Sequence, residues 1–498
     1  MKKYLAISIF SLTVFCNTVN AQSNVLEIEK EDEKDYLAAE DLFDDGKYSQ
    51  AIPFYQKLEK KYPNKSYLNY KIGICYLYRI VDIDKSVEKL EAAYKKDKEL
   101  EDITFYLGKA YLLNSKFDDS KVMMKKFLID PIDSKKTPVA ERIIQNCDNA
   151  KTMLNDTIPA GIQNLGDPIN TPNSEYVPVI SADESVLIYT YLGERSKGGL
   201  QNNKHKPDPE GDYYEDIFIS FKVGSHWLDA ESIGDNINST GNDAPIALSP
   251  DGQKLFIFKS TLKDKGDIYM SKLDGNTWSV PVSLNSNINT NMWEGSVTLS
   301  SDERTLYFAS ERKGGFGGRD LYRSLLQSDG TWGKAENLGP TINTPYNEDA
   351  PFIHPDGKSF YFSSEGHNSI GGYDIFKTKL GEDGIWSKPK NLGLPLNTPG
   401  DDKYYVISAD GLTGYYSSGK VGGFGQQDIY TVTPGVFDEK PVLALIKGVV
   451  FMDDQPGKAN IIVSIADNGD VVGNFSSNSS TGKYLLALPP GKNYKVAF

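Results

Sequence analysis

Cysteine and histidine are both scarce in this chain of 498 residues, which contains three cysteines and four histidines. So few cysteines cannot build the disulfide framework of a small secreted domain. The sequence does not decide whether Cys75 and Cys147 are free or paired. The histidines lack the close, regular spacing of a zinc site, so we expect them to be surface or turn residues. They are His205, His226, His354 and His367.

Long apolar runs are also missing, apart from a short one near the N-terminus. Lys2 and Lys3 precede an apolar stretch over residues 5–14, which is too short to cross a bilayer. The sequence Val19-Asn20-Ala21 then fits the small-residue rule for signal cleavage. We therefore predict a signal peptide over residues 1–21 and an exported mature chain without a transmembrane segment.

Positive charge is outnumbered, because 54 lysines and arginines stand against 68 aspartates and glutamates, giving a net charge of −14. An acidic chain is repelled by nucleic acid and by anionic lipid surfaces. The acidic residues are spread along the chain rather than gathered in a tail. We therefore expect no nucleic-acid partner.

The chain does contain a unit of about 54 residues that recurs five times within residues 164–430. Four landmarks recur 51–54 residues apart, except that the first two asparagines are 68 apart: an asparagine, an aspartate in a turn, an aspartate that opens a strand, and a tryptophan. The asparagines are Asn170, Asn238, Asn289, Asn343 and Asn397, and the strand-opening aspartates are Asp216, Asp267, Asp320, Asp374 and Asp428. A repeat of this length made from short strands is typical of a β-propeller.

Each repeat predicts four strands. In the second copy these are residues 244–248, residues 254–259, a strand that opens at Asp267, and an outer strand over residues 278–284. The turn Ser249-Pro250-Asp251-Gly252 joins the first two, with proline fixing φ and with aspartate and glycine supporting the reversal. The first strand of each repeat is expected to lie nearest the axis of the propeller.

The two ends of the repeat region are complementary. Asn164-Leu165-Gly166 matches the outer-strand endings Asn337-Leu338-Gly339 and Asn391-Leu392-Gly393, whereas the last copy lacks such an ending. We therefore predict that the N-terminal strand completes the last blade and removes an open sheet edge. The prediction is an all-β propeller over residues 161–434 with five blades, or six if residues 431–446 add further strands.

An all-α solenoid of tetratricopeptide (TPR) repeats is predicted over residues 30–155, where apolar and small residues recur at helical spacing. Ala39 and Ala51 fall at the two small-residue positions of a 34-residue helix-turn-helix unit. Gly73 repeats the first of these positions 34 residues later, whereas Ser86 lies one residue late for the second. Three such units and a capping helix are enough for a stable solenoid.

The C-terminal region, residues 445–498, predicts a partial β-sandwich. Strands are expected at residues 447–451, 461–465 and 484–488, separated by turns rich in aspartate, glycine and proline. So few strands cannot bury the faces of two sheets. Because the sequence stops at Phe498 within an expected strand, we expect a truncated domain.

No motif predicts a catalytic, cofactor-binding or metal site. The turn aspartates lack the closely alternating carboxylates of calcium loops, so we expect them to accept backbone N–H bonds. The glycine-rich segments lack the helix and the Lys-Ser/Thr pair of a nucleotide loop, and no Gly-x-Ser-x-Gly elbow is present. Tyr213 and Tyr214, beside a loop insertion at residues 194–212, and Trp293 fall outside the repeat pattern and are candidates for a contact surface.

The turns Ser249-Pro250-Asp251-Gly252 and His354-Pro355-Asp356-Gly357, each followed by an apolar strand, resemble the WD40-like repeat called PD40 of TolB-type periplasmic propellers. The order of signal peptide, TPR region, PD40 propeller and a sandwich similar to carboxypeptidase regulatory-like domains resembles a group of OmpA-family envelope proteins. That group includes PorE of the type IX secretion and gliding machinery. Its members end in an OmpA-like domain that grips peptidoglycan, and no residue of this sequence corresponds to that domain.

The resemblance implies a non-enzymatic periplasmic scaffold, peripheral to the outer membrane, that binds envelope proteins of a secretion or motility complex through its TPR and propeller domains. No cofactor is implied. Peptidoglycan binding would come only through the C-terminal domain that this sequence lacks. An alternative stays open, in which the central channel of the propeller serves a sensor or enzyme for glycans or another small ligand.

Overall fold

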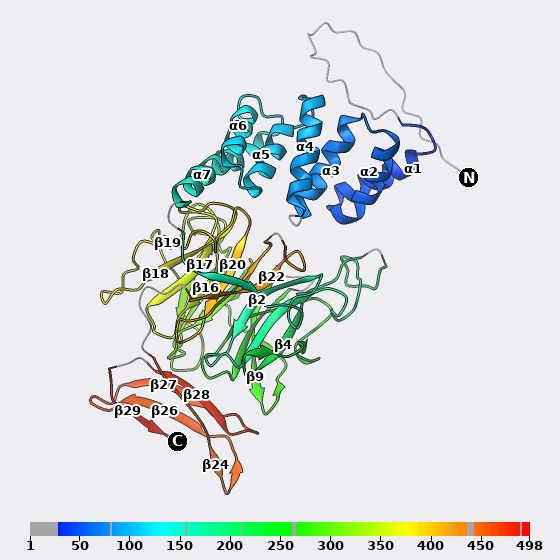
Figure 1. Ribbon diagram of the computed structural model, residues 1–498. Helices are drawn as coiled ribbons and strands as arrows, with labels where there is room; N and C mark the ends of the chain where they lie inside the picture. Colours follow the sequence, from blue (N-terminus) through cyan, green and yellow to red (C-terminus); the bar gives the residue numbers. More distant parts are fainter. Residues whose placement is uncertain are drawn as a thin grey trace.

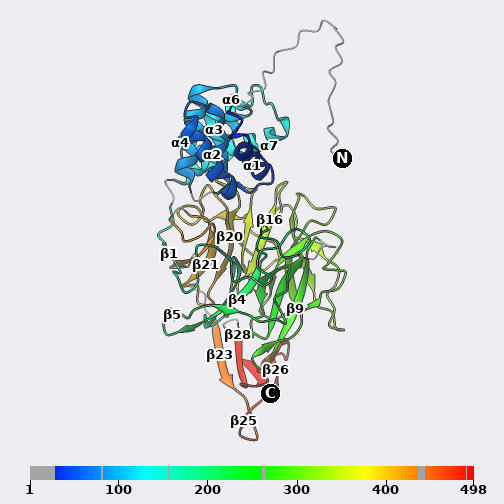
Figure 2. The ribbon, with the colours of Figure 1, turned by 90° about the vertical axis from the view of Figure 1, so that its right-hand side faces the viewer.

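The computed structural model describes residues 28–79, 82–154, 157–209, 211–260, 265–420, 422–435, 443–488 and 491–498. The predicted signal peptide, residues 1–21, lies outside these ranges. Figure 1 shows three parts in chain order, with helices at the top, a propeller in the middle and a small β domain below, and Figure 2 shows the same stack from the side. Among the described helices, none is both long enough and apolar enough to cross a membrane.

The helical part is the predicted solenoid of paired helices. Its helices are α1 (Glu33–Asp44), α2 (Tyr48–Lys61), α3 (Ser66–Arg79), α4 (Ile83–Lys96), α5 (Ile103–Leu113), α6 (Phe117–Phe127) and α7 (Thr137–Met153), with a short 3-10 turn η1 (Ser134–Lys136) before α7. Two glycines allow the paired helices to approach closely. A Cβ on Gly73 would lie 2.6 Å from Cγ of Leu90, and one on Gly108 would lie 2.9 Å from Cε of Met124.

The serine that lies one residue late in the repeat pattern has the same role as its counterpart in the next pair. Ser86 Oγ donates to the carbonyl of Gly73 at 2.8 Å, and Ser120 Oγ donates to the carbonyl of Gly108 at 2.7 Å. Each buried hydroxyl therefore has a partner at the tight crossing of its helix pair. The second unit keeps the TPR arrangement despite the shift in sequence.

Both described cysteines are free thiols buried in the helical core, which decides the question that the sequence leaves open. Cys75 lies in the core of the first two helix pairs, and Cys147 lies in the core that α7 shares with α5 and α6. Burial raises the pKa of both thiols, that of Cys75 to about 12. They stay protonated at neutral pH and pack as small apolar side chains.

Five antiparallel sheets form the propeller. The first three are β2 (Ser174–Ile180), β3 (Val186–Leu192), β4 (Asp216–Val223), β5 (His226–Trp227) and β6 (Glu231–Ser232); β7 (Asn242–Leu248), β8 (Lys254–Ser260), β9 (Asp267–Asp274), β10 (Thr277–Trp278) and β11 (Val282–Ser283); and β12 (Glu294–Leu299), β13 (Thr305–Ser310), β14 (Asp320–Leu325) and β15 (Glu336–Asn337). The last two are β16 (Glu348–Ile353), β17 (Ser359–Ser364), β18 (Asp374–Lys379) and β19 (Lys390–Asn391), and then β20 (Asp402–Ile407), β21 (Gly414–Ser418), β22 (Asp428–Thr433) and β1 (Gly161–Asn164). The first strand of each blade contacts the first strand of the next, and β20 contacts β2 in turn.

The ring is closed by the strand that comes first in the chain, as predicted. β1 pairs with β22, placing Gly161 opposite Thr433 and Asn164 opposite Tyr430. The propeller therefore has five blades. The alternative of a sixth blade is not realised in the described residues, because the next strand, β23, pairs within the C-terminal domain instead.

The outer strand predicted for the second blade is divided in the structure. Residues 278–284 supply only the end of β10 and then β11, and both of these short strands pair with β9. Between them lies Pro281, which has no N–H to donate to a ladder. β10 closes a tight hairpin onto β9 through Gly275, whose φ of 62° suits glycine.

The repeated asparagines join each outer connection to the third strand of the same blade. The side-chain amide of Asn343 accepts from the backbone N–H of Leu321 at 2.8 Å and donates to the carbonyl of Leu321 at 2.9 Å. The same two bonds, between 2.8 and 3.0 Å, are made by Asn170 with Ile429, Asn238 with Ile217, Asn289 with Ile268 and Asn397 with Ile375. We call this contact the asparagine latch.

The C-terminal domain is a small sandwich. Its strands are β23 (Ala444–Val449), β24 (Phe451–Met452), β25 (Gln455–Pro456), β26 (Asn460–Ile465), β27 (Val471–Ser476), β28 (Lys483–Leu488) and β29 (Tyr494–Ala497). The sheet β27-β26-β29 and the pair β23-β28 share a core that includes Val463, Phe475 and Leu486. The strand expected at the end of the sequence is β29, whereas β27 was not predicted, and Pro489-Pro490 of the predicted turn lies outside the described residues.

The sandwich contacts the propeller through the hairpin of the second blade. Asn478 Nδ2 donates to the carbonyl of Gly275 at 2.6 Å, and the N–H of Gly275 donates to Ser479 Oγ at 2.6 Å. Ser479 Oγ in turn donates to the carboxylate of Asp274 at 2.6 Å. The domain below the propeller is thus held by direct contacts as well as by its chain connection.

Replacing Asn343 by alanine should lower the free energy of unfolding of the propeller by about 1–3 kcal/mol. The substitution leaves the buried N–H of Leu321 without a partner and removes one of the two donors to its carbonyl, which also accepts from the N–H of Leu338. Urea unfolding followed by tryptophan fluorescence measures this change. Asn291→Ala, which alters an exposed loop residue, should leave the midpoint unchanged. Equal midpoints for the two variants would show that the latch does not stabilise the ring.

Candidate functional site

The four histidines do not assemble into a site. His205 and His226 belong to the first blade and its insertion, and His354 and His367 belong to the fourth. His354 is fully buried, and its Nδ1 accepts from the N–H of Asp356 in a turn. His367 Nε2 lies 2.9 Å from the carbonyl of Ile342.

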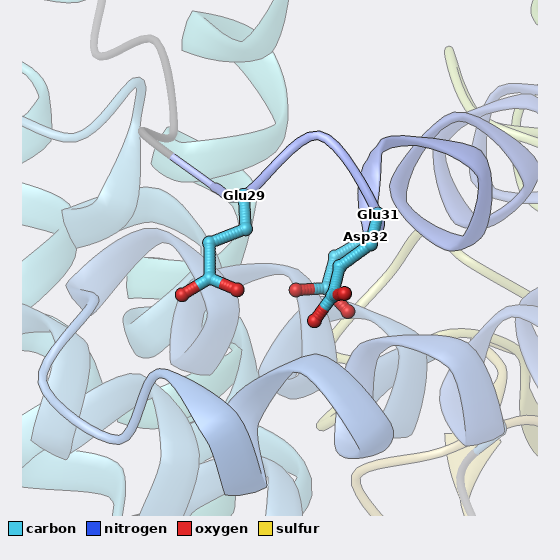
Figure 3. Close-up of side chains that lie close together, drawn as sticks. All are labelled: Glu29, Glu31 and Asp32. Carbon is cyan, nitrogen blue, oxygen red and sulfur yellow. The ribbon is translucent and has the colours of Figure 1, made fainter.

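In the part of the chain that the structure describes, one cluster of carboxylates comes close enough together to suggest a metal ion. It consists of Glu29, Glu31 and Asp32, whose side chains lie side by side before α1 in Figure 3. The ammonium of Lys61 already lies 2.8 Å from Glu29, 2.5 Å from Glu31 and 2.8 Å from Asp32. A lysine of the protein therefore already lies among these three carboxylates and offsets part of their charge, so their proximity is accounted for without a metal ion.

The aspartates of the repeats accept hydrogen bonds within tight turns. Asp320 accepts from the N–H groups of Phe316 and Gly317 at 2.6 and 2.9 Å, in the glycine-rich loop before β14. Asp251 accepts from the hydroxyl of Ser249 and from the N–H of Gln253. These carboxylates hold the loops that the sequence analysis considered as possible calcium or phosphate sites.

Each innermost strand carries a buried carboxylate close to its start, bound by a hydroxyl residue four positions earlier. Thr344, for example, donates to Glu348 from its N–H at 2.8 Å and from its Oγ1 at 2.6 Å. The five carboxylates are Glu175, Asp243, Glu294, Glu348 and Asp402. Burial raises the pKa of Glu175 and of Glu348 to about 7 and that of Asp402 to about 6.

The central channel is nearly filled by side chains from the innermost strands. The cavity that these strands enclose measures about 20 Å³, the space of a water molecule, whereas small-molecule sites occupy roughly 300–1,000 Å³. Its lining includes Val177, Ile246, Val297, Phe352 and Tyr405, one from each blade.

A charged cluster surrounds the fourth innermost strand. Asp349, fully buried, accepts from Arg319 at 2.6 Å and from Lys403 at 3.1 Å. Burial alone would raise the pKa of Asp349, but the two cations hold it well below its usual range. The guanidinium of Arg319 also stacks on Trp293, 3.5 Å from the ring centroid. Trp293, a candidate for a contact surface, therefore makes an internal contact.

Of the other two off-repeat aromatics, Tyr214 also makes internal contacts. Its hydroxyl donates to the carbonyl of Asn202 at 3.0 Å, and its ring packs edge-on against His205 at 4.6 Å. Both partners belong to the insertion of residues 194–212, so Tyr214 orders that loop. Tyr213 is partly exposed in the same segment.

The helices and the propeller meet at a joint built around α7, which lies directly above the fourth blade in Figure 1. Arg142 on α7 donates to the carbonyls of Glu365 and Gly366 at 2.5 and 2.7 Å and to Ser369 Oγ at 2.8 Å. Ile370, from the same loop between β17 and β18, is fully buried in the core of α5, α6 and α7. The loop of residues 365–372 is therefore held by the helices as well as by its own blade.

Beside this joint lies a cleft of about 540 Å³, which we call the interdomain cleft. One wall comes from the alternate helices α3, α5 and α7, and the other from the loops of the fourth and fifth blades. Its lining is mostly apolar, with Lys109, Arg142, Glu365 and Asp401 as the charged members. The volume falls in the range of ordinary ligand sites.

The cleft is the functional candidate that the sequence analysis missed, because its two walls come from distant parts of the chain, residues 77–146 and residues 346–401. One signal was present in the sequence. Lys109 is the single charged residue of α5, whose other residues are apolar, small or hydroxyl-bearing. A single cation in such a helix is compatible with a solvated position, and it is equally compatible with a functional or interface position.

Comparisons with known proteins do not assign the chain to a family. No family model matches the sequence, and no curated protein matches it.

Several solved structures resemble parts of it. They include TolB from Acinetobacter baumannii, at 17% identity and a TM-score of 0.31, with 63% of this chain and 65% of TolB covered. They also include the type III secretion translocator chaperone SycD from Yersinia enterocolitica, at 16% identity and a TM-score of 0.23, with 26% of this chain and 90% of SycD covered. An α-L-arabinofuranosidase from Lactobacillus brevis aligns at 13% identity and a TM-score of 0.37, with 56% of this chain and 93% of the enzyme covered. Similarities at this level carry no argument about activity.

The propeller should be more stable at pH 6.0 than at pH 7.5, by roughly 1–3 kcal/mol. The folded-state pKa values of Glu175 and Glu348, about 7, lie above the ordinary glutamate value, so the folded state binds more protons across this window. Stability then falls as pH rises through the folded pKa. His367, whose pKa burial lowers, has the opposite effect and reduces the difference. Urea unfolding at the two pH values tests this, and Glu348→Gln should weaken the dependence.

Replacing Arg142 by alanine should release the loop of residues 365–372 from α7, because it removes the donors to Glu365, Gly366 and Ser369. Hydrogen exchange of that loop should rise by roughly tenfold or more, since local opening no longer breaks the joint. Glu141→Ala, an exposed neighbour on the same helix, serves as the control. Unchanged exchange in Arg142→Ala would mean that Ile370 and the side chains of Asn146 and Asn149, which donate to Gly371 and Ser369, hold the loop without the guanidinium.

Proposed function

We propose that this protein is a non-enzymatic scaffold that binds protein partners through its TPR helices and its propeller. The observation that carries the proposal is the interdomain cleft. There the two repeat domains enclose a mostly apolar space with a volume of about 540 Å³. Its charged members are joined to backbone groups or spread over opposite walls, and no nucleophile is paired with a base there. Such a surface is suited to recognition rather than to bond breaking.

The rigidity of the joint supports the same function. Arg142 and Ile370 hold the two domains in one orientation, so a partner that contacts both would not have to order them first. Preorganisation of this kind reduces the cost of association. The mature chain is acidic, which favours partners with basic or neutral surfaces over nucleic acid.

We place this scaffold in the periplasm, peripheral to the outer membrane, on the strength of the predicted signal peptide and of the resemblance to OmpA-family envelope proteins. Within that setting its partners would be envelope proteins of a secretion or motility complex, such as the type IX system. A link to peptidoglycan would require the OmpA-like domain that such proteins carry.

The alternative function, a glycan or small-ligand sensor or enzyme that uses the propeller channel, receives less support from the geometry. A channel cavity of about 20 Å³ would have to widen by more than tenfold to hold a sugar. The buried carboxylates at the starts of the innermost strands, such as Glu294 and Glu348, accept from threonine and serine hydroxyls, so a role in holding these strand starts accounts for them without a substrate.

Affinity purification of the tagged full-length chain from cell-envelope fractions, after mild cross-linking, should recover at least one envelope protein in near-stoichiometric amount. In parallel, a thermal-shift panel of glycans and muropeptides should leave the melting temperature of the protein within about 1 °C. A saturable shift with one glycan, together with no recovered partner, would overturn the scaffold proposal in favour of the ligand-binding alternative.

A further inference from the structure

We propose that the interdomain cleft binds a peptide segment of a partner protein, and that this segment carries apolar side chains and one carboxylate that pairs with Lys109. The inference rests on the proposed scaffold function and specifies the site and the chemistry of its ligand. The helical wall supplies the apolar surface and the cation, and the propeller wall limits what else the ligand can carry.

The apolar surface of the helical wall is only partly covered within the chain. Tyr78 on α3 keeps 42% of its surface exposed and Val139 on α7 keeps 47%, although both line the cleft. Leu77, Leu112 and Ile143 lie behind them as a buried layer. Covering such side chains on binding removes apolar area from water, which contributes about 25 cal/mol for each Å².

The helical wall carries two cations. Arg142 is bound to the carbonyls of Glu365 and Gly366, whereas Lys109 has no anionic partner in contact. Lys109 Nζ forms no ion pair with the described residues and lies over the ring of Tyr78, 4.7 Å from its centroid. Burial lowers the pKa of Lys109, and the more distant carboxylate of Asp401 offsets this only in part. A carboxylate in the cleft would therefore meet a cation that is partly desolvated and unpaired, where charge-assisted hydrogen bonds are strongest.

The opposite wall carries the acidic side chains Glu365 and Asp401. A ligand with negative charge along its whole length would face repulsion there, whereas a single carboxylate near Lys109 would not. The backbone of this wall is also fixed closely. A Cβ on Gly372 would lie 2.0 Å from Oδ1 of Asp401, and one on Gly371 would lie 2.5 Å from backbone atoms of Pro399. These two glycines allow the loops of neighbouring blades to touch and form a firm surface.

The shape of the cleft favours a peptide over a small molecule. The space is open to solvent rather than sealed, and it extends along three helices and two blades. A chain can enter and leave such a cleft while one of its segments is held. Because both walls are already held together by Arg142 and Ile370, the segment would bear most of the ordering cost itself.

A selection of phage-displayed random 12-residue peptides on the full-length chain tests the proposal. Recovered peptides should combine apolar residues with at least one carboxylate, and their affinities are then measured by fluorescence anisotropy. Lys109→Met should weaken binding by tenfold or more, and Lys109→Arg should keep it within about threefold. Replacing the peptide carboxylate by its amide should weaken binding to the wild type but not further weaken binding to Lys109→Met.

Two further variants provide controls that do not depend on the buried lysine. Lys125→Ala, which removes an exposed lysine of α6, should bind like the wild type. Val139→Glu places a negative charge in the cleft, which should repel the carboxylate of the peptide and abolish binding. Because Val139 is half-exposed, the variant should still fold, and circular dichroism checks this. Recovery of no peptide, or of peptides that bind Lys109→Met and Val139→Glu as well as the wild type, would overturn the proposal.

The same variants separate this inference from the scaffold function. If Lys109→Met and Val139→Glu still recover the envelope partner in the affinity purification, the scaffold function stands and the cleft is not its binding site. If no peptide is selected and decanoate displaces a fluorescent fatty-acid analogue from the cleft, the occupant is a small apolar carboxylate. The peptide proposal is then wrong.

Discussion

The asparagine latch is the contact on which the ring depends. The outer strands β15 and β19 contain only two residues each, so the third strands of these blades are not covered by a full neighbouring strand. In the third blade, the amide of Asn343 supplies the acceptor for the N–H of Leu321 and adds a second donor to its carbonyl, which also accepts from the N–H of Leu338. The residue before each asparagine, Ile342 for example, is buried between the blades, so the same turn satisfies the polar groups and fills the core. The recurrence of the asparagine in every blade follows from these two requirements.

The repeat period predicted most of the architecture because it reflects local chemistry that each blade must repeat. The landmark asparagines, the turn aspartates and the matching ends near Asn164 led to five blades and to the closing strand β1. The sequence did not predict the division of the outer strand at Pro281. One continuous short strand and two shorter strands give the same alternation of apolar residues over so few positions. Sequence reasoning also missed β27, whose apolar residues alternate weakly. The interdomain cleft was beyond sequence reasoning, because the contact of Arg142 with residues 365–369 depends on how two finished domains meet.

The two repeat domains differ in which of their surfaces are covered. The propeller uses its buried carboxylates and its aromatic core to stay closed, and its axis is filled rather than open. The helices keep their inner layer partly uncovered, with Tyr78 and Val139 facing a wall that they do not touch closely. Recognition is therefore assigned to the boundary between the domains, while the interior of each domain provides stability.

The position of the closing strand determines how the molecule would respond to mechanical load. Gly161, where the chain leaves the helices, lies opposite Thr433, from which the chain runs on to the sandwich. Tension applied through these two connections would peel β1 from β22 one hydrogen bond at a time, because the load would fall on a single pair. The joint at Arg142 and the contact of Asn478 with Gly275 instead attach the outer domains to the fourth and second blades. A pull between the helices and the sandwich is therefore passed into the bodies of two blades, and the seam of the ring is spared.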